Sequence, residues 1–452
     1  MFWKRVASYH SPSKHSGRNY DENVKARRDW RVWLQIGTLG FGGPAGQIAL
    51  LQRELIEKHK WISHDELSRT IALTSIIPGP EAHQTATYIG LKRSGLKGAL
   101  TAATLFIAPG AVITAALAGL YLAAGDLPVV RGALQGLQAS VIAIIAAALI
   151  SLGRRALVSK LLWLVAGASF IASFFLGIPF ILVALALGTA AFAVRPELAT
   201  HPETPTLQSV QLGRLIDKPK RVVAIGVSLL ALVAVCVLAI NIWTGSDSRW
   251  GSLAWVLLVS AYTLGGAYAI VDYASQEFVI NYGWLSATDM SVGLGLGEST
   301  PGPLILVLEF ASILAAATDP FSLLPIWLAG ALAGLLAVFV LFATSTGIIL
   351  SIAPFTDRLL ASARLRQAMR VISAAVVGVL VSLGLSFAIT TFFGEVELTR
   401  FGDLVQVLTP TLDSIYWPTV LIGALAAVLL FRLRLPLWQV ALISAGVGAL
   451  IH

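Results

Sequence analysis

Apolar residues fill this chain in long runs, and short polar stretches between the runs carry most of its charges. A helix of about twenty apolar residues spans the hydrocarbon core of a bilayer. The pattern therefore predicts an all-α polytopic membrane protein. The expected spans lie near residues 32–52, 67–91, 98–124, 132–153, 161–194 (a short pair), 222–243, 252–272, 287–317, 324–351, 371–393, 415–431 and 435–451.

The composition supports this class. Of 452 residues, 56% are hydrophobic and 12% are charged, against roughly 25% charged in soluble domains. The net charge is +8, but Lys and Arg lie in short loops between apolar spans, where they indicate membrane topology rather than nucleic-acid binding. Cys236 is the single cysteine, so we expect neither a disulfide nor a cysteine-based metal site. The polar, basic start predicts no cleaved signal peptide.

Two Pro-Gly-Pro sequences interrupt apolar segments, at Pro78-Gly79-Pro80 and at Pro301-Gly302-Pro303. Proline removes a backbone donor and glycine adds freedom, so a continuous helix is not expected at either place. Within a bilayer, non-helical backbone is tolerated only where it is buried in protein or lines a cavity. Pro80 and Pro303 are suited to begin new helices whose amide groups face the gap. The two breaks thus predict an anion site, with a packing kink as the alternative.

The two motifs belong to an internal repeat with a constant offset of 223 residues. Similar hydropathy is common among membrane segments, but hydropathy alone does not place matching Glu and Trp residues. We therefore interpret the repeat as a duplication. The identities pair Gly42-Gly43 with Gly265-Gly266, Glu54 with Glu277, Trp61 with Trp284, Ser63 with Ser286, and the two Pro-Gly-Pro motifs with each other.

The repeat divides the chain into five parts. They are a basic cytoplasmic tail at 1–31, a first repeat at 32–194, a cytoplasmic linker at 195–221, an extra span and connection at 222–251, and a second repeat at 252–452.

Basic loops orient the spans. If each Pro-Gly-Pro segment crosses the bilayer once, there are about thirteen spans, with the N-terminus in the cytoplasm and the C-terminus outside. Equivalent spans then run in opposite directions, which makes two inverted-topology repeats, the usual plan of a secondary transporter. Re-entrant hairpins at both segments are the alternative, and they would place the basic residues of 92–97 and 154–160 outside.

In an inverted arrangement, the helices that begin at Pro80 and Pro303 approach each other near the pseudo-twofold axis. Their amide groups and nearby hydroxyls would surround a small oxyanion. For each hydroxyl, capping of the local backbone is the alternative. The hydroxyl candidates are Thr74, Ser75, Ser299 and Thr300.

Ionisable residues within apolar spans are costly and usually functional. Glu298 precedes the second break and Glu309 follows it, while Glu81 and His83 follow the first break. We take these four as candidates for proton coupling, although Glu81 also suits a helix start and His83 also suits a packed core. A run of acidic residues without Lys or Arg between them also suggests proton handling. These residues are Asp272, Glu277, Asp289, Glu298, Glu309, Asp319 and Asp357.

Catalytic and cofactor-binding motifs are not evident. A Walker A sequence, a nucleophile elbow and a His/Cys cluster with metal spacing are all lacking, so we expect no enzyme, no ATP hydrolysis and no cofactor. An intramembrane enzyme or a passive channel remains an alternative to a carrier. The partners expected are a small oxyanion and the lipid bilayer, with oligomeric state open and a homodimer among the options.

Together these motifs resemble the chromate ion transporters in their two-domain form. The first domain is carried by Phe41-Gly42-Gly43-Pro44, Trp61-Ile62-Ser63 and Ile77-Pro78-Gly79-Pro80, and the second by Gly265-Gly266, Gly283-Trp284-Leu285-Ser286 and Ser299-Thr300-Pro301-Gly302-Pro303. The resemblance implies chromate export across the bacterial cytoplasmic membrane, giving resistance, with sulfate as a structural mimic. It also implies functional roles for Gly42, Gly43, Pro44, Pro78, Gly79, Pro80, Gly265, Gly266, Pro301, Gly302 and Pro303.

The sequence departs from the family pattern near both breaks. A glutamine common before each Pro-Gly-Pro is replaced by Thr74-Ser75 in the first repeat and by Glu298 in the second. A carboxylate would repel a dianion unless it were protonated, so we hypothesise that Glu298 is protonated while the anion is bound. Proton-coupled transport of sulfate or another oxyanion is therefore the alternative to chromate export.

Overall fold

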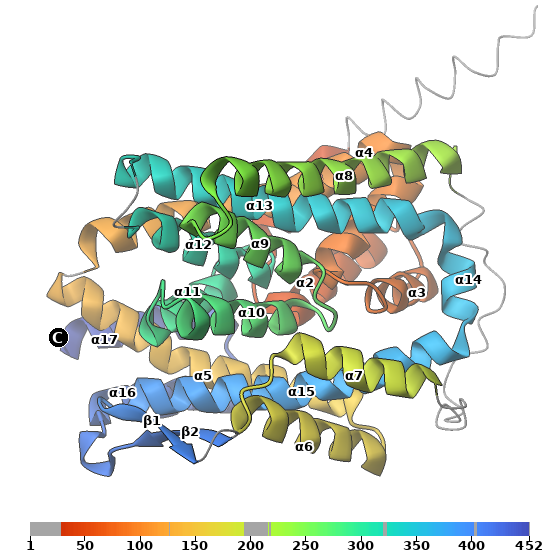
Figure 1. The fold of residues 1–452 in the computed structure, drawn as a ribbon. Coiled ribbons are helices and arrows are strands. Elements are labelled where there is room, and N and C mark those ends of the chain that lie inside the picture. Colours follow the sequence, from red (N-terminus) through yellow and green to blue (C-terminus); the bar gives the residue numbers. More distant parts are fainter. Residues whose placement is uncertain are drawn as a thin grey trace, which may run out of the picture.

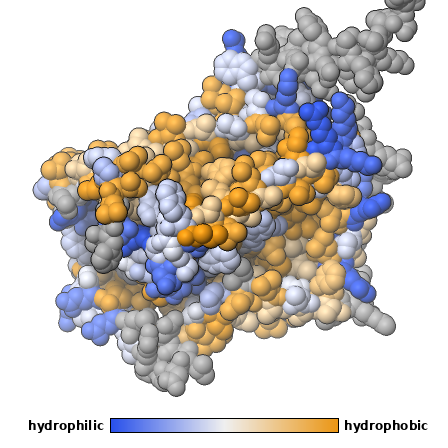
Figure 2. Space-filling model, turned by 45° about the horizontal axis from the view of Figure 1, so that its top comes forward, coloured by the Kyte–Doolittle hydropathy of each residue, from blue (hydrophilic) through white to orange (hydrophobic). Residues whose placement is uncertain are grey.

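The computed structural model describes residues 29–125, 127–193, 216, 218–319, 323–401 and 405–451. Most of the expected tail at 1–31 and of the linker at 195–221 lies outside these residues. The described chain forms a bundle in which the long helices run side by side along one direction (Figure 1). Hydrophobic side chains cover broad areas of the face in Figure 2, as expected for a surface in contact with lipid.

Five helices among the described residues are long and apolar enough to cross a membrane. A break at Ser94 and Gly95 divides the first of them, so its crossing part begins after Gly95. The five are α4 (Glu81–Ala124), α5 (Pro128–Ala156), α8 (Pro219–Thr244), α13 (Ile326–Ile352) and α15 (Ala363–Phe392).

Shorter helices fill the space between the long ones. A helix at 29–39 comes first, and α6 and α7 form the short pair expected near 161–194. The remaining short helices are α2 (Gly43–Gln52), α3 (His64–Thr74), α6 (Lys160–Phe174), α7 (Phe180–Ala193), α9 (Arg249–Ala261), α10 (Ala267–Ser275), α11 (Ala287–Ser299), α12 (Val307–Ala317), α14 (Thr356–Ala361), α16 (Trp417–Ala427) and α17 (Leu437–Ile451).

A β-hairpin that we did not predict connects α15 to α16. Its strands are β1 (Val396–Phe401) and β2 (Val405–Pro410), and they pair antiparallel with Val396 opposite Pro410. The hairpin lies at one end of the bundle, beside the start of α16 (Figure 1).

The first Pro-Gly-Pro segment is a hairpin that returns to the end where it began. Thr74 and Thr85, on either side of the break, have their hydroxyl oxygens 3.1 Å apart. At the ends of the two helices away from the break, Lys92 forms an ion pair with Glu66. Helix α3 and the first part of α4 are therefore antiparallel. Eleven residues of α3 reach only roughly 16 Å, about half of the hydrocarbon core.

Residues 29–58 form a second hairpin at the same end. The helix at 29–39 breaks at Gly40, and the chain returns through α2 to Trp61, whose ring centroid lies 5.7 Å from that of Trp33. The Arg93 Nε is 2.6 Å from the Asp29 Oδ2, so the outer ends of both hairpins meet.

The second half of the chain contains the same arrangement of two hairpins. Helices α9 and α10 enclose one break, and α11 and α12 enclose the second Pro-Gly-Pro. Arg249 at the start of α9 pairs with Asp319 after α12, with Nε and Oδ1 3.6 Å apart. The start of the first of these two hairpins therefore meets the end of the second.

These hairpins differ from the expected single crossing of each Pro-Gly-Pro segment, and the expected count of about thirteen spans does not describe the structure. The reason is that each break reverses the chain instead of only interrupting a helix. Residues 29–58 also form a hairpin, so the chain returns to the same end of the bundle twice. The basic stretch 92–97 therefore stays at the end where residue 29 lies, which the sequence argument against hairpins did not consider.

Helices α4 and α13, one from each half of the chain, run in opposite directions. The C-terminal part of α4 meets the start of α13, where a Cβ on Gly119 would lie 3.7 Å from the Trp327 ring. Near the other end of α13, the Thr356 Oγ1 on α14 is 3.3 Å from the hydroxyl of Tyr88, which lies just before the break in α4. Helix α4 and helix α13 are thus antiparallel neighbours.

Helix α12 occupies the centre of the apolar core. Every residue from Val307 to Ala317 is buried, which is typical of a helix surrounded by protein on all sides. It packs against α13 and α4. The second Pro-Gly-Pro break, directly before α12, is consequently held deep inside the protein.

Candidate functional site

The second Pro-Gly-Pro break is held by the first half of the chain. The N–H of Gly302 donates to the carbonyl oxygen of Gly40 over 3.1 Å, and the Gln47 Nε2 on α2 donates to the carbonyl oxygen of Gly302. Helix α4 approaches so closely that a Cβ on Gly110 would lie 2.3 Å from the Pro301 carbonyl oxygen. The break therefore packs against backbone, with no room for added side chains.

The first Pro-Gly-Pro break is held by the second half. The Ser345 Oγ on α13 would be 3.5 Å from a Cβ on Gly79 and is 3.0 Å from the His83 Nδ1. The Gln84 side chain closes the break from its own helix, with Nε2 2.6 Å from the Pro78 carbonyl oxygen. Each Pro-Gly-Pro is thus fixed by contacts from the opposite half.

The first Gly-Gly element meets a carboxylate from the opposite half. Gly43 has φ +62°, and a Cβ built on it would lie 2.8 Å from the Glu298 Oε2. Tyr268, in the first turn of α10, donates its hydroxyl to the Glu298 Oε1 over 2.8 Å. Glu298 is 1% exposed. The buried carboxylate at the second Pro-Gly-Pro break is therefore contacted by residues at both Gly-Gly elements, Gly43 and Tyr268.

The second Gly-Gly element has a comparable neighbour. A Cβ on Gly266 would lie 3.6 Å from the Glu81 Oε1, and Ser75 lies beside the same carboxylate. With the offset of 223 residues, Ser75 is the counterpart of Glu298. In the first half, the carboxylate therefore comes from the residue after the Pro-Gly-Pro rather than from the position before it.

Short terminal hairpins support both Gly-Gly elements from outside. Leu437, at the start of α17, would be 3.5 Å from a Cβ on Gly42. Phe180, at the start of α7, would be 3.1 Å from a Cβ on Gly265. The last hairpin of each half thus contacts the first break of the other half.

The candidate hydroxyls fall into two groups. Thr74 donates to the Ile71 carbonyl oxygen and Ser299 to the Gly295 carbonyl oxygen, which is the local capping considered as the alternative. Ser75 faces Glu81, and Thr300 is buried with no hydrogen-bond partner for its Oγ1. Thr300 and Ser75 are therefore the two hydroxyls that remain suited to contact a bound ion.

Buried polar atoms without a hydrogen-bond partner gather near the breaks in the described part of the chain. Leaving such an atom unpaired costs roughly 1–3 kcal/mol, so a cluster of them requires an explanation. The five atoms closest in sequence to the breaks are the His83 Nε2, Gln84 Oε1, Ser260 Oγ, Glu298 Oε2 and Thr300 Oγ1.

The remaining ionisable candidates, His83 and Glu309, lie in the apolar core. His83 is fully buried, and its ring centroid lies 6.2 Å from that of Phe106 and 5.1 Å from that of Phe342. This is the packed core position considered as the alternative. Glu309 is also buried, and its Oε2 has no hydrogen-bond partner. It lies on α12, where a Cβ on Gly334 of α13 would be 3.6 Å from its Cγ.

Sequence reasoning missed Tyr268, Gln47 and Ser345. Each is a polar residue within or beside an apolar segment, and that position was the available signal. Their partners are distant in sequence, so only the folded chain shows the contacts. Tyr268 lies two residues after Gly266, which a search for polar residues after each break would have found.

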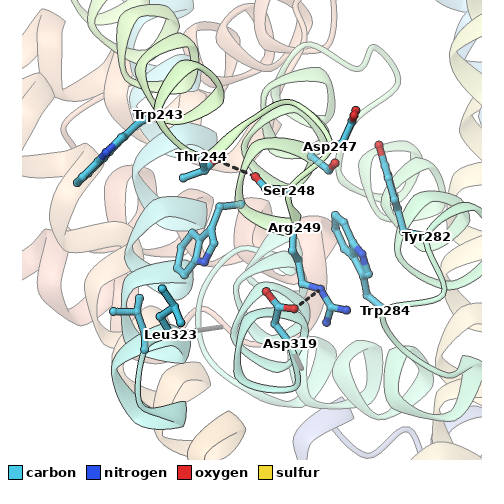
Figure 3. A pocket seen from close by; sticks show the side chains of 12 residues that line it. Trp243, Thr244, Asp247, Ser248, Arg249, Tyr282, Trp284, Asp319 and Leu323 are labelled. Carbon is cyan, nitrogen blue, oxygen red and sulfur yellow. Dashed lines mark hydrogen bonds and ion pairs between the residues drawn. The ribbon is translucent and has the colours of Figure 1, made fainter. Parts of the chain in front are cut away.

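Two hollows lie away from the breaks. The larger, about 820 Å³, is lined by Trp243, Trp284, Arg249 and Asp319 among others (Figure 3), and the Arg249–Asp319 ion pair crosses it. The second, about 640 Å³, is lined by polar residues such as Gln138 and Thr288. The residues of the four breaks line neither hollow. Within the described ranges, no group of three or more His, Cys, Asp or Glu residues is arranged to hold a metal ion.

Comparison with known proteins places this arrangement in a family. The sequence profile described as "Chromate transporter" matches residues 30–192 and 250–449, which contain all four breaks. The chain belongs to the chromate transporter family. As a member of that family with long apolar helices, this chromate transporter homologue is a multi-pass membrane protein.

Several relatives of this chromate transporter homologue carry informative names. A chromate transport protein of Pseudomonas aeruginosa is 29% identical over 297 residues, covering 63% of this chain and 65% of the relative. A probable chromate transport protein of Synechococcus elongatus is 28% identical, covering 63% and 68%. An uncharacterized transporter of Methanocaldococcus jannaschii is 24% identical, covering 81% and 85%. The first matches therefore span about two thirds of the relatives' length. No solved structure matches the chain.

Proposed function

We propose that this protein is a secondary transporter that moves chromate, a tetrahedral oxyanion, out of the cytoplasm. The observation that supports the proposal is the packing of four helix breaks, in which the breaks of each half contact the other half. Each break contacts the opposite half, and the second Pro-Gly-Pro break carries two unpaired buried polar atoms, the Glu298 Oε2 and the Thr300 Oγ1. Helical breaks at this depth are characteristic of binding sites in carriers.

We infer that the two halves are inverted repeats. The antiparallel relation of α4 and α13 and the matched hairpins support this inference. In such carriers, one half moves against the other around a fixed site. The substrate contacts we propose are the two Gly-Gly elements, the two Pro-Gly-Pro breaks and the nearby hydroxyls, which are Gly42, Gly43, Pro44, Thr74, Ser75, Pro78, Gly79, Pro80, Gly265, Gly266, Ser299, Thr300, Pro301, Gly302 and Pro303.

The orientation follows from the distribution of basic residues. Lys92, Arg93 and Arg358 belong to the end of the bundle where residue 29 lies, and we place that end in the cytoplasm of a bacterial cell. With the inside negative, moving one charge across 100 mV is worth roughly 2.3 kcal/mol, so a dianion gains about 4.6 kcal/mol on export. Export therefore needs no ATP.

Flux measurements in liposomes test this function. The full-length protein is reconstituted, and chromate and sulfate movements are followed at fixed membrane voltage and pH. We expect chromate flux that increases when the voltage favours outward movement, together with exchange of labelled anion against a trans gradient. Exchange separates a carrier from a passive channel. Absence of flux for both anions under all conditions would exclude the proposal.

Proton-coupled transport of sulfate or another oxyanion is the second candidate. The observation that favours it is a pair of buried carboxylates, Glu298 and Glu309, each with an oxygen that has no hydrogen-bond partner. Buried carboxylates of this kind are common in proton pathways. Sulfate accumulation driven by a pH gradient at zero voltage would favour this function over chromate export.

A further inference from the structure

Helix α2 begins at the centre of the protein with a carboxylate at its N-terminus. Its first residue, Gly43, is buried and follows Gly42, whose φ is +88°. The first amide groups of a helix have no intrahelical acceptor, and they carry the positive end of the helix dipole. The Glu298 Oε2 would be 2.8 Å from a Cβ on Gly43, is buried, and has no hydrogen-bond partner among the residues that the structure describes. The carboxyl group therefore lies beside the first turn of α2 without a hydrogen bond to its amide groups, of which Pro44 contributes none.

The same relation occurs in the second half. Helix α10 begins after Gly266, whose φ is +81°. The Glu81 Oε1 would lie 3.6 Å from a Cβ on that glycine. In both halves, a carboxylate from the Pro-Gly-Pro hairpin of one repeat is therefore placed at the start of the Gly-Gly helix of the other repeat.

We propose that the N-termini of α2 and α10 are the oxyanion-binding ends, and that Glu298 and Glu81 are tethered anions that occupy them until the transported ion displaces them. This inference rests on the proposed oxyanion transport. It shifts the main binding role from the Pro-Gly-Pro helices to the Gly-Gly helices. The Pro-Gly-Pro breaks then serve to carry the carboxylates to these sites.

The close contact explains why glycine is required at residue 43. Its Cβ position is taken by the carboxylate, so a larger residue would push Glu298 out of the site. A helix N-terminus of this kind suits an ion whose oxygens accept hydrogen bonds from backbone amides, as for phosphate and sulfate at other helix N-termini. A bound dianion and a charged Glu298 cannot share it, because like charges at this distance repel strongly in a buried place.

Glu298 has few charged neighbours to offset such repulsion. Tyr268 on α10 is the titratable group in contact with it among the described residues. The helices packed against α11 are α5, α12, α15 and α17. Their ionisable residues are Arg131, Arg154 and Arg155 on α5, Glu309 on α12, and Arg364, Arg366 and Arg370 on α15, with none on α17.

No ion pair joins Glu298 to any of these residues in the described ranges. Protonation of Glu298 is therefore the direct way to remove its charge when the anion arrives. Each binding event would then take up a proton at the Glu298 carboxyl group, and anion release would return it.

Equilibrium binding of radiolabelled sulfate and of chromate to the purified full-length protein tests this role. The wild type is expected to bind more weakly at pH 8 than at pH 6, because charged Glu298 competes for the site. Glu298→Gln keeps the shape and the acceptor for Tyr268 but not the charge. It is expected to bind at least roughly tenfold more tightly than the wild type at pH 8, which corresponds to about 1.4 kcal/mol, and to lose most of the pH dependence.

Asp289→Asn is the matched control, because it neutralises a carboxylate at the other end of α11 from Glu298, where Asp289 accepts from the Ser286 N–H. It should keep the wild-type pH dependence. Glu298→Ala provides a second variant if the glutamine protein does not fold, and it must change affinity in the same direction. A thermal melt of each protein confirms folding.

Two results would overturn the inference separately from the proposed function. If the wild type binds and transports anion but folded Glu298→Gln keeps the same affinity and pH dependence, the tethered-anion role is wrong and oxyanion transport stands. If Asp289→Asn reproduces the effect, the charge acts from a distance and the site at α2 is wrong. If the wild type neither binds nor transports either anion, the proposed function itself fails.

Discussion

The N–H of Gly302 donates to the carbonyl oxygen of Gly40 across 3.1 Å, although the two glycines are 262 residues apart. This bond joins the second Pro-Gly-Pro break to the first break of the other half. Both glycines are buried, so the bond lies away from solvent and lipid. A carrier that moves one half against the other must either keep this bond at its pivot or break it in each cycle.

Gly110→Ala is expected to disrupt this region. The added Cβ would lie 2.3 Å from the Pro301 carbonyl oxygen and 3.0 Å from the Gly302 Cα, and backbone atoms cannot give way cheaply. Overpacking of this kind costs typically 1–3 kcal/mol. We expect a lower melting temperature and little anion flux. Gly119→Ala on the same helix is the control, since its nearest neighbour would be 3.7 Å away, and an equal loss in both variants would contradict the packing argument.

The sequence was sufficient to locate the breaks. Proline and glycine at residues 78–80 and 301–303 predicted interrupted helices, and the structure ends α11 at Ser299 and resumes helix at Leu304. The short pair α6 and α7, with a turn near Gly177, was predicted from the length of one apolar run. Both features depend on residues that are neighbours in the sequence, so they can be predicted without knowledge of distant contacts.

The direction of the chain after each break could not be predicted in the same way. A break allows either a crossing or a reversal, and distant contacts such as Glu66 with Lys92 decide between them. The β-hairpin at 396–410 was missed because its short strands lie between two strong membrane helices. The pairing of Glu298 with Gly43 depends on how the two halves interlock, which no local pattern specifies.

Tyr268→Phe is expected to change the pH dependence of anion binding. The hydroxyl donates to the Glu298 Oε1 over 2.8 Å, and hydrogen bonds to charged groups contribute about 1.5–3 kcal/mol. Without this donor, charged Glu298 is less favoured, so binding should persist to higher pH than in the wild type. Sulfate binding measured from pH 5 to pH 9 checks this. Tyr282→Phe, which alters a tyrosine stacked on Trp284, should leave the profile in place.

Cysteine labelling distinguishes hairpins from crossings. In a Cys236→Ser background, Glu57→Cys and Lys97→Cys should react with a membrane-impermeant maleimide from the same side of the membrane. A single crossing between them would place them on opposite sides. Residues 57 and 280 are equivalent by the offset of 223, so Ile280→Cys should react from the side opposite to Glu57→Cys. Labelling of all three from one side would exclude inverted halves.

The ion pairs at the two ends of the molecule have opposite polarity, which allows a charge-exchange test. Asp29 precedes the first hairpin and Arg93 ends the second, with 2.6 Å between them. In the other half, Arg249 takes the first place and Asp319 the last. Since each pair joins two hairpins, removing one partner should loosen the unit and leave a partly buried charge, at a cost of up to roughly 3 kcal/mol.

We therefore expect Arg93→Asp to lower both the melting temperature and chromate flux, and Asp29→Arg with Arg93→Asp to recover a large part of both. The recovery has a physical reason, because the second half already uses the reversed order beside its equivalent tryptophan, Trp284, over which Arg249 lies at 5.9 Å. The guanidinium of Arg93 also lies 3.8 Å over the Trp61 ring. If the double variant is no better than Arg93→Asp, this stacking rather than the ion pair holds the hairpins together.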